Sequence, residues 1–237
     1  ETVSLMNTLV ENGADMIELG IPFSDPIADG PVIQRASERA LKNKVGIKDT
    51  IKLAKDFRKK NKETPLILMG YANPIEAIGV ENFISLIKEA QIDGVITVDY
   101  PPEESKEFVK KLNKEKIDSI FLISPTTEDE RIKLIAKQAS GFLYYVSLKG
   151  VTGAANIDIE QVSKNVKNIQ KYSELPVAVG FGVRDPKTAK AVSEISDGVV
   201  IGSRIVREIE ESDEIEIISN VKKLMHSMKT AIDSSSV

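Results

Sequence analysis

The chain has 237 residues, 41% of them hydrophobic and 29% charged, a balance that predicts a globular protein with a sizeable buried core. Its 32 basic and 36 acidic residues give a net charge of −4, which argues against nucleic acid or an anionic membrane as a partner. No cysteine is present, so disulfides, thiolate catalysis and cysteine-ligated metals are excluded. The single histidine, His226, argues against Ser-His-Asp catalysis and multi-histidine metal sites, and the composition fits the reducing cytoplasm.

The first residues predict an amphipathic helix, with Val3, Met6, Leu9 and Val10 on its apolar side. The seven short runs that follow are continuously apolar, which is typical of strands buried on both faces. These predicted strands span residues 16–22, 65–71, 94–99, 118–124, 142–147, 176–182 and 197–203.

Amphipathic segments alternate with the apolar runs. In residues 128–138, for example, Ile132, Ile135 and Ala136 share one face of a helix. Further helices are predicted over residues 47–61, 103–116 and 159–171. Strand–helix alternation without an internal linker favours an α/β fold of the (β/α)8 TIM-barrel type, as a single domain over residues 1–237. A doubly wound open sheet is the alternative, although no G-x-G-x-x-G motif follows the first strand.

A carboxylate lies within the first predicted strand, where Glu18 is flanked by Ile17 and Leu19. We expect its side chain to face the barrel interior or its mouth. Burial there raises the pKa of a carboxyl group towards neutrality, as a proton-shuttling acid/base requires. From position alone, pairing with a barrel lysine is an equally good interpretation.

A second carboxylate, Asp29, follows in a loop that is stiffened by Pro22, Pro26 and Pro31. Such a loop can hold Asp29 over the mouth of the barrel, and two converging carboxylates indicate acid/base catalysis. Taken on its own, Asp29 is better interpreted as an exposed loop residue. A glycosidase pair is a further alternative. It is disfavoured because glycines at the ends of the last two predicted strands indicate a phosphate-binding site.

Glycines close the last two predicted strands, at Gly180 and Gly182 and again at Gly202 before Ser203. At this end of a barrel, backbone N–H groups and a helix N-terminus commonly bind a phosphate dianion. Glycine also marks tight turns, so each of these positions alone is a weak signal. Residues 147–158 contain two glycines and several small side chains, which suit either a lid or an ordinary surface loop.

Longer motifs recur at the carboxyl ends of the predicted strands. They are ELGIPFSDPIADGP (18–31), LMGYANPI (68–75), DYPPEES (99–105), FLISPTT (121–127), YYVSLKGVTGA (144–154), VGFGV (179–183) and GVVIGSRIV (198–206). In their order and spacing, over essentially the whole chain, these motifs resemble the α subunits of tryptophan synthase.

The resemblance implies roles for individual residues. Glu18 matches the family's catalytic acid/base, Asp29 matches the aspartate near the indole nitrogen, and Tyr144 matches an active-site tyrosine.

Three further groups of residues are also implied by the resemblance. The positions that contact the substrate phosphate are Gly153, Gly182, Gly202 and Ser203. The closing loop contributes Thr152. The indole pocket is lined by Met69, Ile96 and Phe181, for which simple barrel packing is an equal alternative.

The resemblance also implies the reaction, a retro-aldol cleavage of indole-3-glycerol phosphate to indole and glyceraldehyde 3-phosphate in tryptophan biosynthesis. Glu18 would protonate indole C3 and then accept the hydroxyl proton, while Asp29 stabilises the ring nitrogen. No metal or organic cofactor is implied for this subunit, because pyridoxal phosphate is expected only in the β subunit. The expected partner is that β subunit, in an αββα tetramer, with residues 24–31 and 73–74 at the contact.

Other functions stay open. A different phosphate-binding barrel, such as an indole-glycerol-phosphate synthase or a sugar-phosphate isomerase, shares the glycines but lacks the Glu18–Asp29 pair and the GVTG segment. A stand-alone lyase that releases free indole is a closer alternative. In a different class, the chain would be a non-catalytic activator of a β subunit, but the intact Glu18, Asp29 and Tyr144 argue against that function.

Members of the resembled family carry a short helix and a strand before the segment that begins here at Glu1. The seven predicted strands leave none to pair with both 16–22 and 197–203, as closure of an eight-stranded barrel requires. We therefore expect the natural protein to have residues before Glu1. Otherwise we expect an open barrel of low stability and poor activity, with two edge strands that invite aggregation. A strand from residues 212–237 is disfavoured as the filler by their lysine-rich helical pattern.

Overall fold

The computed structural model describes residues 1–147, 158–180 and 182–234. Within them, one parallel sheet follows the order of the chain. Its strands are β1 (Ile17–Gly20), β2 (Leu66–Gly70), β3 (Gly94–Thr97), β4 (Asp118–Ile123), β5 (Leu143–Val146), β6 (Val177–Gly180) and β7 (Gly198–Val199). Each strand lies inside one of the apolar runs, so the predicted strands are confirmed.

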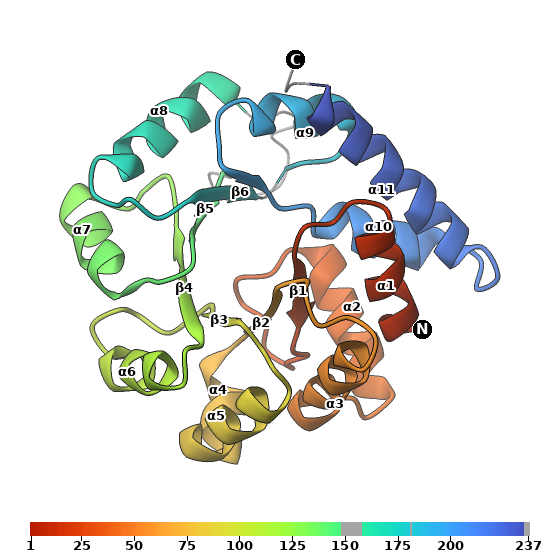
Figure 1. Ribbon diagram of the computed structural model, residues 1–237, viewed down its shortest axis with the longest axis horizontal. Coiled ribbons are helices and arrows are strands. Elements are labelled where there is room, and N and C mark those ends of the chain that lie inside the picture. Colours follow the sequence, from red (N-terminus) through yellow and green to blue (C-terminus); the bar gives the residue numbers. More distant parts are fainter. Residues whose placement is uncertain (148–157, 181, 235–237) are drawn as a thin grey trace.

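Helices surround the curled sheet on its outside (Figure 1). They are α1 (Thr2–Glu11), α2 (Pro31–Lys42), α3 (Ile47–Arg58), α4 (Ala72–Ile78), α5 (Val80–Glu89), α6 (Lys106–Lys114), α7 (Asp129–Gln138), α8 (Ile159–Gln170), α9 (Pro186–Ser193), α10 (Ser203–Glu211) and α11 (Ile217–Asp233). The helices predicted from amphipathic periodicity are confirmed as α1, α3, α6, α7 and α8. This arrangement is that of a parallel (β/α) barrel.

Each strand has an outer face against the helices and an inner face, because successive side chains point to opposite sides. On β2, Leu66 and Leu68 pack outward in the core shared with the helices, whereas Ile67 and Met69 point inward. The buried residues of the inner cluster are Ile67, Ile96, Ile120 and Tyr144. The barrel interior is therefore packed with side chains, and a polar group there has apolar surroundings.

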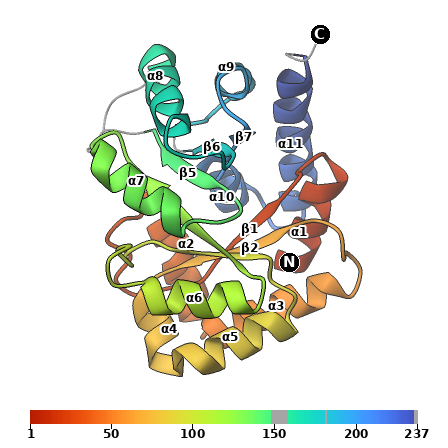
Figure 2. The ribbon, with the colours of Figure 1, turned by 60° about the vertical axis from the view of Figure 1, so that its left-hand side comes forward.

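The two edges of the sheet do not meet in the described part of the chain, where β1 pairs only with β2 and β7 only with β6. Helices continue the outer layer past these edges: α1 packs on α3 and α11, and α10 packs on α2 and α11 (Figures 1 and 2). Glu210 of α10 accepts hydrogen bonds from Arg35 and Arg39 of α2, at 2.7 and 2.6 Å. Residues 217–233 form a helix rather than a strand, as the sequence predicts.

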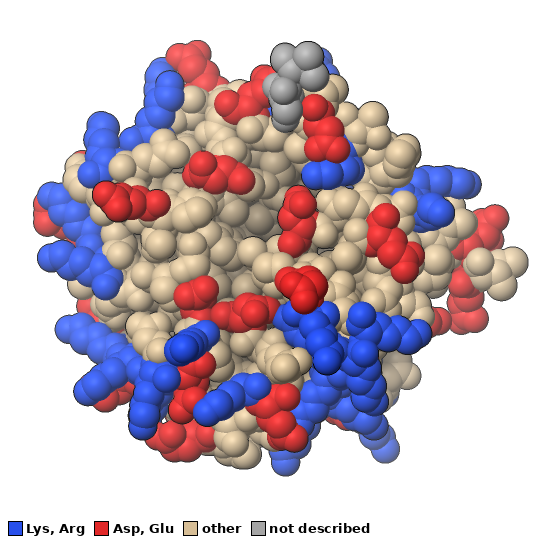
Figure 3. Space-filling view, viewed as in Figure 1, with Lys and Arg blue, Asp and Glu red and all other residues tan. Residues whose placement is uncertain are grey.

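Basic side chains lie mainly around the rim of the face shown in Figure 3, with acidic groups among them and towards the middle. This distribution is the one expected of solvated outer helix faces. Across residues 1–147, 158–180 and 182–234, no helix has the length and apolarity needed to cross a bilayer.

Candidate active site

Glu18 lies on the inner face of β1, opposite Ile67 of β2 in the parallel ladder. Its neighbours Ile17 and Leu19 are buried on the outer face, so alternation directs the carboxyl group towards the barrel interior. Burial, and to a smaller extent the negative charge of Asp29, raise the pKa of Glu18 to about 7. No cation from the described residues contributes to this pKa, so the geometry favours a proton carrier over a lysine-paired structural group.

Asp29 is half-buried in the loop between β1 and α2, and several hydrogen bonds fix that loop. The backbone N–H of Asp29 donates to the Pro26 carbonyl at 3.0 Å, and the Gln34 side chain donates to the Asp29 carbonyl at 2.8 Å. The carboxylate Oδ2 accepts a hydrogen bond of 3.1 Å from the hydroxyl of Tyr71. Burial raises the pKa of Asp29, and the Tyr71 hydrogen bond opposes that rise.

Tyr144 lies on the inner face of β5 and is only 4% exposed. Burial and the nearby charge of Glu18 raise the pKa of its hydroxyl well above the ordinary value, so the phenol stays protonated. Its ring rests against Gly180 of β6, where an added Cβ would lie 2.4 Å from the Tyr144 hydroxyl oxygen. Glycine at position 180 therefore leaves the space that the phenol occupies.

The glycines predicted to contact phosphate lie where the last strands end. Gly182 follows β6 and has a φ of +84°, a conformation that side chains rarely adopt. Gly202 is the N-cap of α10, and Ser203 is its first residue, so unpaired backbone N–H groups of a helix N-terminus are presented there. Gly153, Thr152, Phe181 and the remainder of the predicted lid, residues 148–157, lie outside the described residues.

Two of the three residues predicted for the indole pocket belong to the inner cluster. Ile96 of β3 is fully buried and Met69 of β2 is partly buried, and the two are paired in the ladder. They share the barrel interior with Glu18 and Tyr144. An apolar wall beside the two polar groups suits a flat aromatic ligand, and their role as pocket residues stays a prediction.

Tyr71 is a contact of the site that the sequence interpretation missed. It closes the predicted strand 65–71, where a tyrosine among apolar residues looks like barrel packing. The sequence feature that could have indicated it is a hydroxyl-bearing side chain at the carboxyl end of a strand, where barrel enzymes place functional groups.

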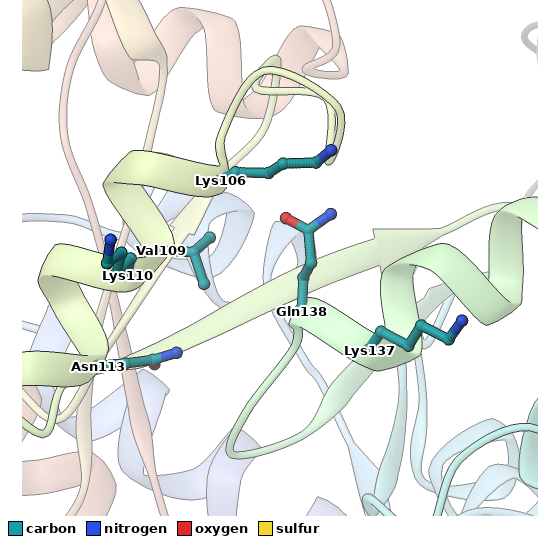
Figure 4. A pocket seen from close by; sticks show the side chains of 6 residues that line it. All are labelled: Lys106, Val109, Lys110, Asn113, Lys137 and Gln138. Carbon is teal, nitrogen blue, oxygen red and sulfur yellow. The ribbon is translucent and has the colours of Figure 1, made fainter.

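A separate groove of about 260 Å³ lies on the outside of the barrel, between α6 and α7. Figure 4 shows the side chains that line it, which are Lys106, Val109, Lys110, Asn113, Lys137 and Gln138. The groove holds no carboxylate and lies away from Glu18, so it offers no acid/base chemistry. No group of three or more histidine or acidic side chains in the described part of the chain is arranged to hold a metal ion.

The inner-face Glu18, the fixed Asp29 and the glycine turns after β6 and β7 form the arrangement expected of one class of protein, a barrel enzyme with acid/base groups beside an anion-binding end. The profile of the family described as "Tryptophan synthase alpha chain" matches residues 1–233.

Individual relatives agree with the family match. The tryptophan synthase alpha chain of Thiobacillus denitrificans is 55% identical, over 99% of this chain and 86% of its own. The solved alpha subunit from Legionella pneumophila superposes with a TM-score of 0.90 at 44% identity, covering 98% of this chain and 87% of that one. A chain of the tryptophan synthase complex from Pyrococcus furiosus gives a TM-score of 0.86 at 37% identity, covering 97% and 91%.

This chain belongs to the tryptophan synthase alpha chain family. The predictions of a (β/α) barrel and of a lyase of tryptophan biosynthesis are therefore confirmed.

Proposed function

We propose that Glu18 and Asp29 carry out the α reaction in this chain, the cleavage of indole-3-glycerol phosphate to indole and glyceraldehyde 3-phosphate. The observation that carries this proposal is the position of Glu18 on the barrel's inner face, with a pKa of about 7. A carboxyl group with that pKa is present in both protonation states near neutral pH. It can therefore give a proton and take one within a single turnover.

The first step is protonation of indole C3 by Glu18, which places a positive charge on the ring nitrogen. The carboxylate of Asp29 stabilises that charge electrostatically. The bond between C3 and the glycerol chain then breaks, and its electron pair returns to the ring and neutralises the nitrogen. The adjacent hydroxyl loses its proton to the Glu18 carboxylate as the aldehyde forms, which restores the starting state of the enzyme.

The phosphate anchors the substrate away from the reacting carbon. Gly182, Gly202 and Ser203 offer backbone N–H groups and a helix N-terminus, and Gly153 is assigned to the same set by the resemblance. The indole ring would lie against Met69 and Ile96, with Tyr144 beside Glu18. Holding both ends of the substrate lowers the entropic barrier to cleavage.

The β subunit is the partner we propose, in an αββα tetramer, and it would carry the pyridoxal phosphate. Support comes from the Pyrococcus furiosus match, which is a chain of a tryptophan synthase complex. The loop between β1 and α2 (residues 21–30, the catalytic loop) holds Asp29 and also exposes Ile27, whose side chain is 84% accessible. A large exposed apolar side chain in a catalytic loop is suited to burial against another protein.

The purified chain tests the reaction directly when it is given indole-3-glycerol phosphate alone and then with a matching β subunit. We expect indole and glyceraldehyde 3-phosphate in equal amounts, and faster turnover with the β subunit. Failure to release indole under either condition would overturn the proposal. Indole release that is unaffected by β, with no complex at micromolar concentrations, would instead support a stand-alone lyase.

A further inference from the structure

Tyr71 lies directly between β2 and α4 and is only 3% exposed. Its ring packs against Phe23, with 5.4 Å between the ring centroids. The backbone on both sides is fixed: the Gly70 carbonyl accepts a hydrogen bond from Val98 at 2.9 Å, and the Ala72 N–H donates to Asp99 at 2.7 Å. The backbone of Tyr71 is therefore fixed by the sheet, while its ring packs on the same β1–α2 loop that holds Asp29.

The Tyr71 hydroxyl makes two hydrogen bonds of different kinds to the catalytic loop. It donates to Oδ2 of Asp29 and accepts from the Ala28 N–H, each at 3.1 Å. A phenol has one proton, and the bond from Ala28 occupies a lone pair, so the proton is left for Asp29. The single proton of the phenol is thus directed at Oδ2 of Asp29.

We propose that Tyr71 is a positioning residue. Its hydroxyl holds the Asp29 carboxylate ionised and aims it at the ring nitrogen of the substrate. The proposal rests on the proposed function for the role of Asp29. The alternative is that the Tyr71 hydroxyl only caps the loop through Ala28, in which case its removal would not change the ionisation of Asp29.

Among the described residues, the charged groups around this contact are acidic. Glu18 of β1 lies near Asp29, and Asp99 after β3 lies near Tyr71. Burial raises the pKa of Asp29, and the hydrogen bond from Tyr71 is the influence that counters it. Burial, together with Asp29 and Asp99, also raises the pKa of Tyr71 to about 12, against the Ala28 hydrogen bond, so the phenol remains a donor at neutral pH.

The test compares two substitutions that each remove one buried tyrosine hydroxyl. Tyr71→Phe keeps the ring packing and loses the bond to Asp29. Tyr145→Phe is the matched control, because Tyr145 is 1% exposed on the outer face of β5 and its hydroxyl bonds only to Asn165 among the described residues. For Tyr71→Phe we expect kcat to fall on the order of tenfold, as for loss of one charge-assisted hydrogen bond, with KM nearly unchanged. The acid limb of the pH profile should move to higher pH, and Tyr145→Phe should show neither change.

A second variant tests the same contact without removing it. Fluorotyrosine at position 71 is a stronger donor of nearly the same shape, so it should move the acid limb to lower pH. In a ¹³C NMR titration of the Asp29 carboxyl, assigned with Asp29→Asn, the midpoint should move to higher pH in Tyr71→Phe and to lower pH in the fluorotyrosine variant. An unchanged Asp29 titration in both Tyr71 variants overturns the positioning role, even if activity falls. Because this titration needs no turnover, it decides the role of Tyr71 separately from any failure of the wild-type protein to release indole.

Discussion

The carboxyl group of Glu18 lies among apolar inner-face side chains, and this placement links its chemistry to the stability of the fold. Its pKa rises from 4.5 to about 7 on folding. The folded state therefore holds the Glu18 proton between these pH values, while the unfolded chain releases it. The resulting stability is fully present below pH 4.5 and is lost as the pH rises through about 7.

Glu18→Gln removes this loss, because glutamine cannot ionise. We expect the difference in unfolding free energy between variant and wild type to move in favour of the variant by about 3 kcal/mol between pH 4.5 and pH values above 7. Urea unfolding of both proteins at several pH values measures the difference. A difference that stays constant with pH would show that Glu18 titrates normally.

Gly180 is tested by adding a single methyl group. Gly180→Ala places a Cβ 2.4 Å from the Tyr144 hydroxyl oxygen, so the phenol must move. We expect about 1–3 kcal/mol of destabilisation from overpacking, together with lower activity. Gly20→Ala is the control for stability, because a Cβ at Gly20 meets nothing within 4 Å. Equal unfolding midpoints for the two variants would contradict the close contact.

Glu18 could be singled out from the sequence because a glutamate inside an apolar strand conflicts with ordinary packing. An aspartate in a loop is ordinarily exposed, so the role of Asp29 is implied only by the family resemblance. Tyr71 could not be found in this way, since a tyrosine suits a barrel interior whether or not its hydroxyl binds anything. Its role depends on a contact between residues 42 positions apart, which no local pattern reveals.

At the scale of elements, the loops at the two ends of the barrel serve different purposes. Catalytic groups follow the carboxyl ends of strands, whereas the turns before β2 and β3 are held by Arg58 at the end of α3. Its guanidinium donates to the carbonyls of Gln91 and Thr64, at 2.9 and 2.7 Å, and to the carboxylate of Asp93.

Arg58→Met should therefore reduce stability without reducing catalysis. Arg58 is 6% exposed, and its loss removes the donor of part-buried hydrogen bonds to two carbonyl groups, so we expect about 1–3 kcal/mol of destabilisation. Activity of the folded enzyme should remain close to that of the wild type. Lys59→Met is the control, since Lys59 is exposed and pairs only with Asp56 among the described residues. Similar unfolding midpoints for the two variants would refute a structural role for Arg58.

The elements themselves were largely predictable, but their ends were not. The strand expected over residues 197–203 is shortened to Gly198–Val199, because β7 has only β6 as a neighbour in the described chain. Ile201 and Gly202 already belong to the turn into α10. The helices α2, α4, α5 and α9 were not predicted; α4 has only seven residues, with Pro74 inside it, which is too short to show a helical period.

At the scale of the whole molecule, the exposed isoleucines of the described residues lie at two places: Ile27 in the catalytic loop, and Ile215 and Ile218 near the start of α11. Ile27→Glu should weaken the complex with the β subunit by about tenfold or more if that loop is the contact. Ile215→Glu is the matched control, because Ile215 is 94% exposed between α10 and α11. Sedimentation of each variant with β measures the affinity. Equal weakening by both substitutions, or by neither, would place the contact elsewhere.

The central claim is that Glu18 moves the protons of the cleavage, and the rate of indole release by Glu18→Gln tests it most directly. Glutamine keeps the size and polarity of the side chain but cannot carry a proton. We expect the rate to fall on the order of a hundredfold or more, with binding of a glycerol-phosphate ligand retained. Near-wild-type indole release by a folded, ligand-binding Glu18→Gln protein would contradict the account.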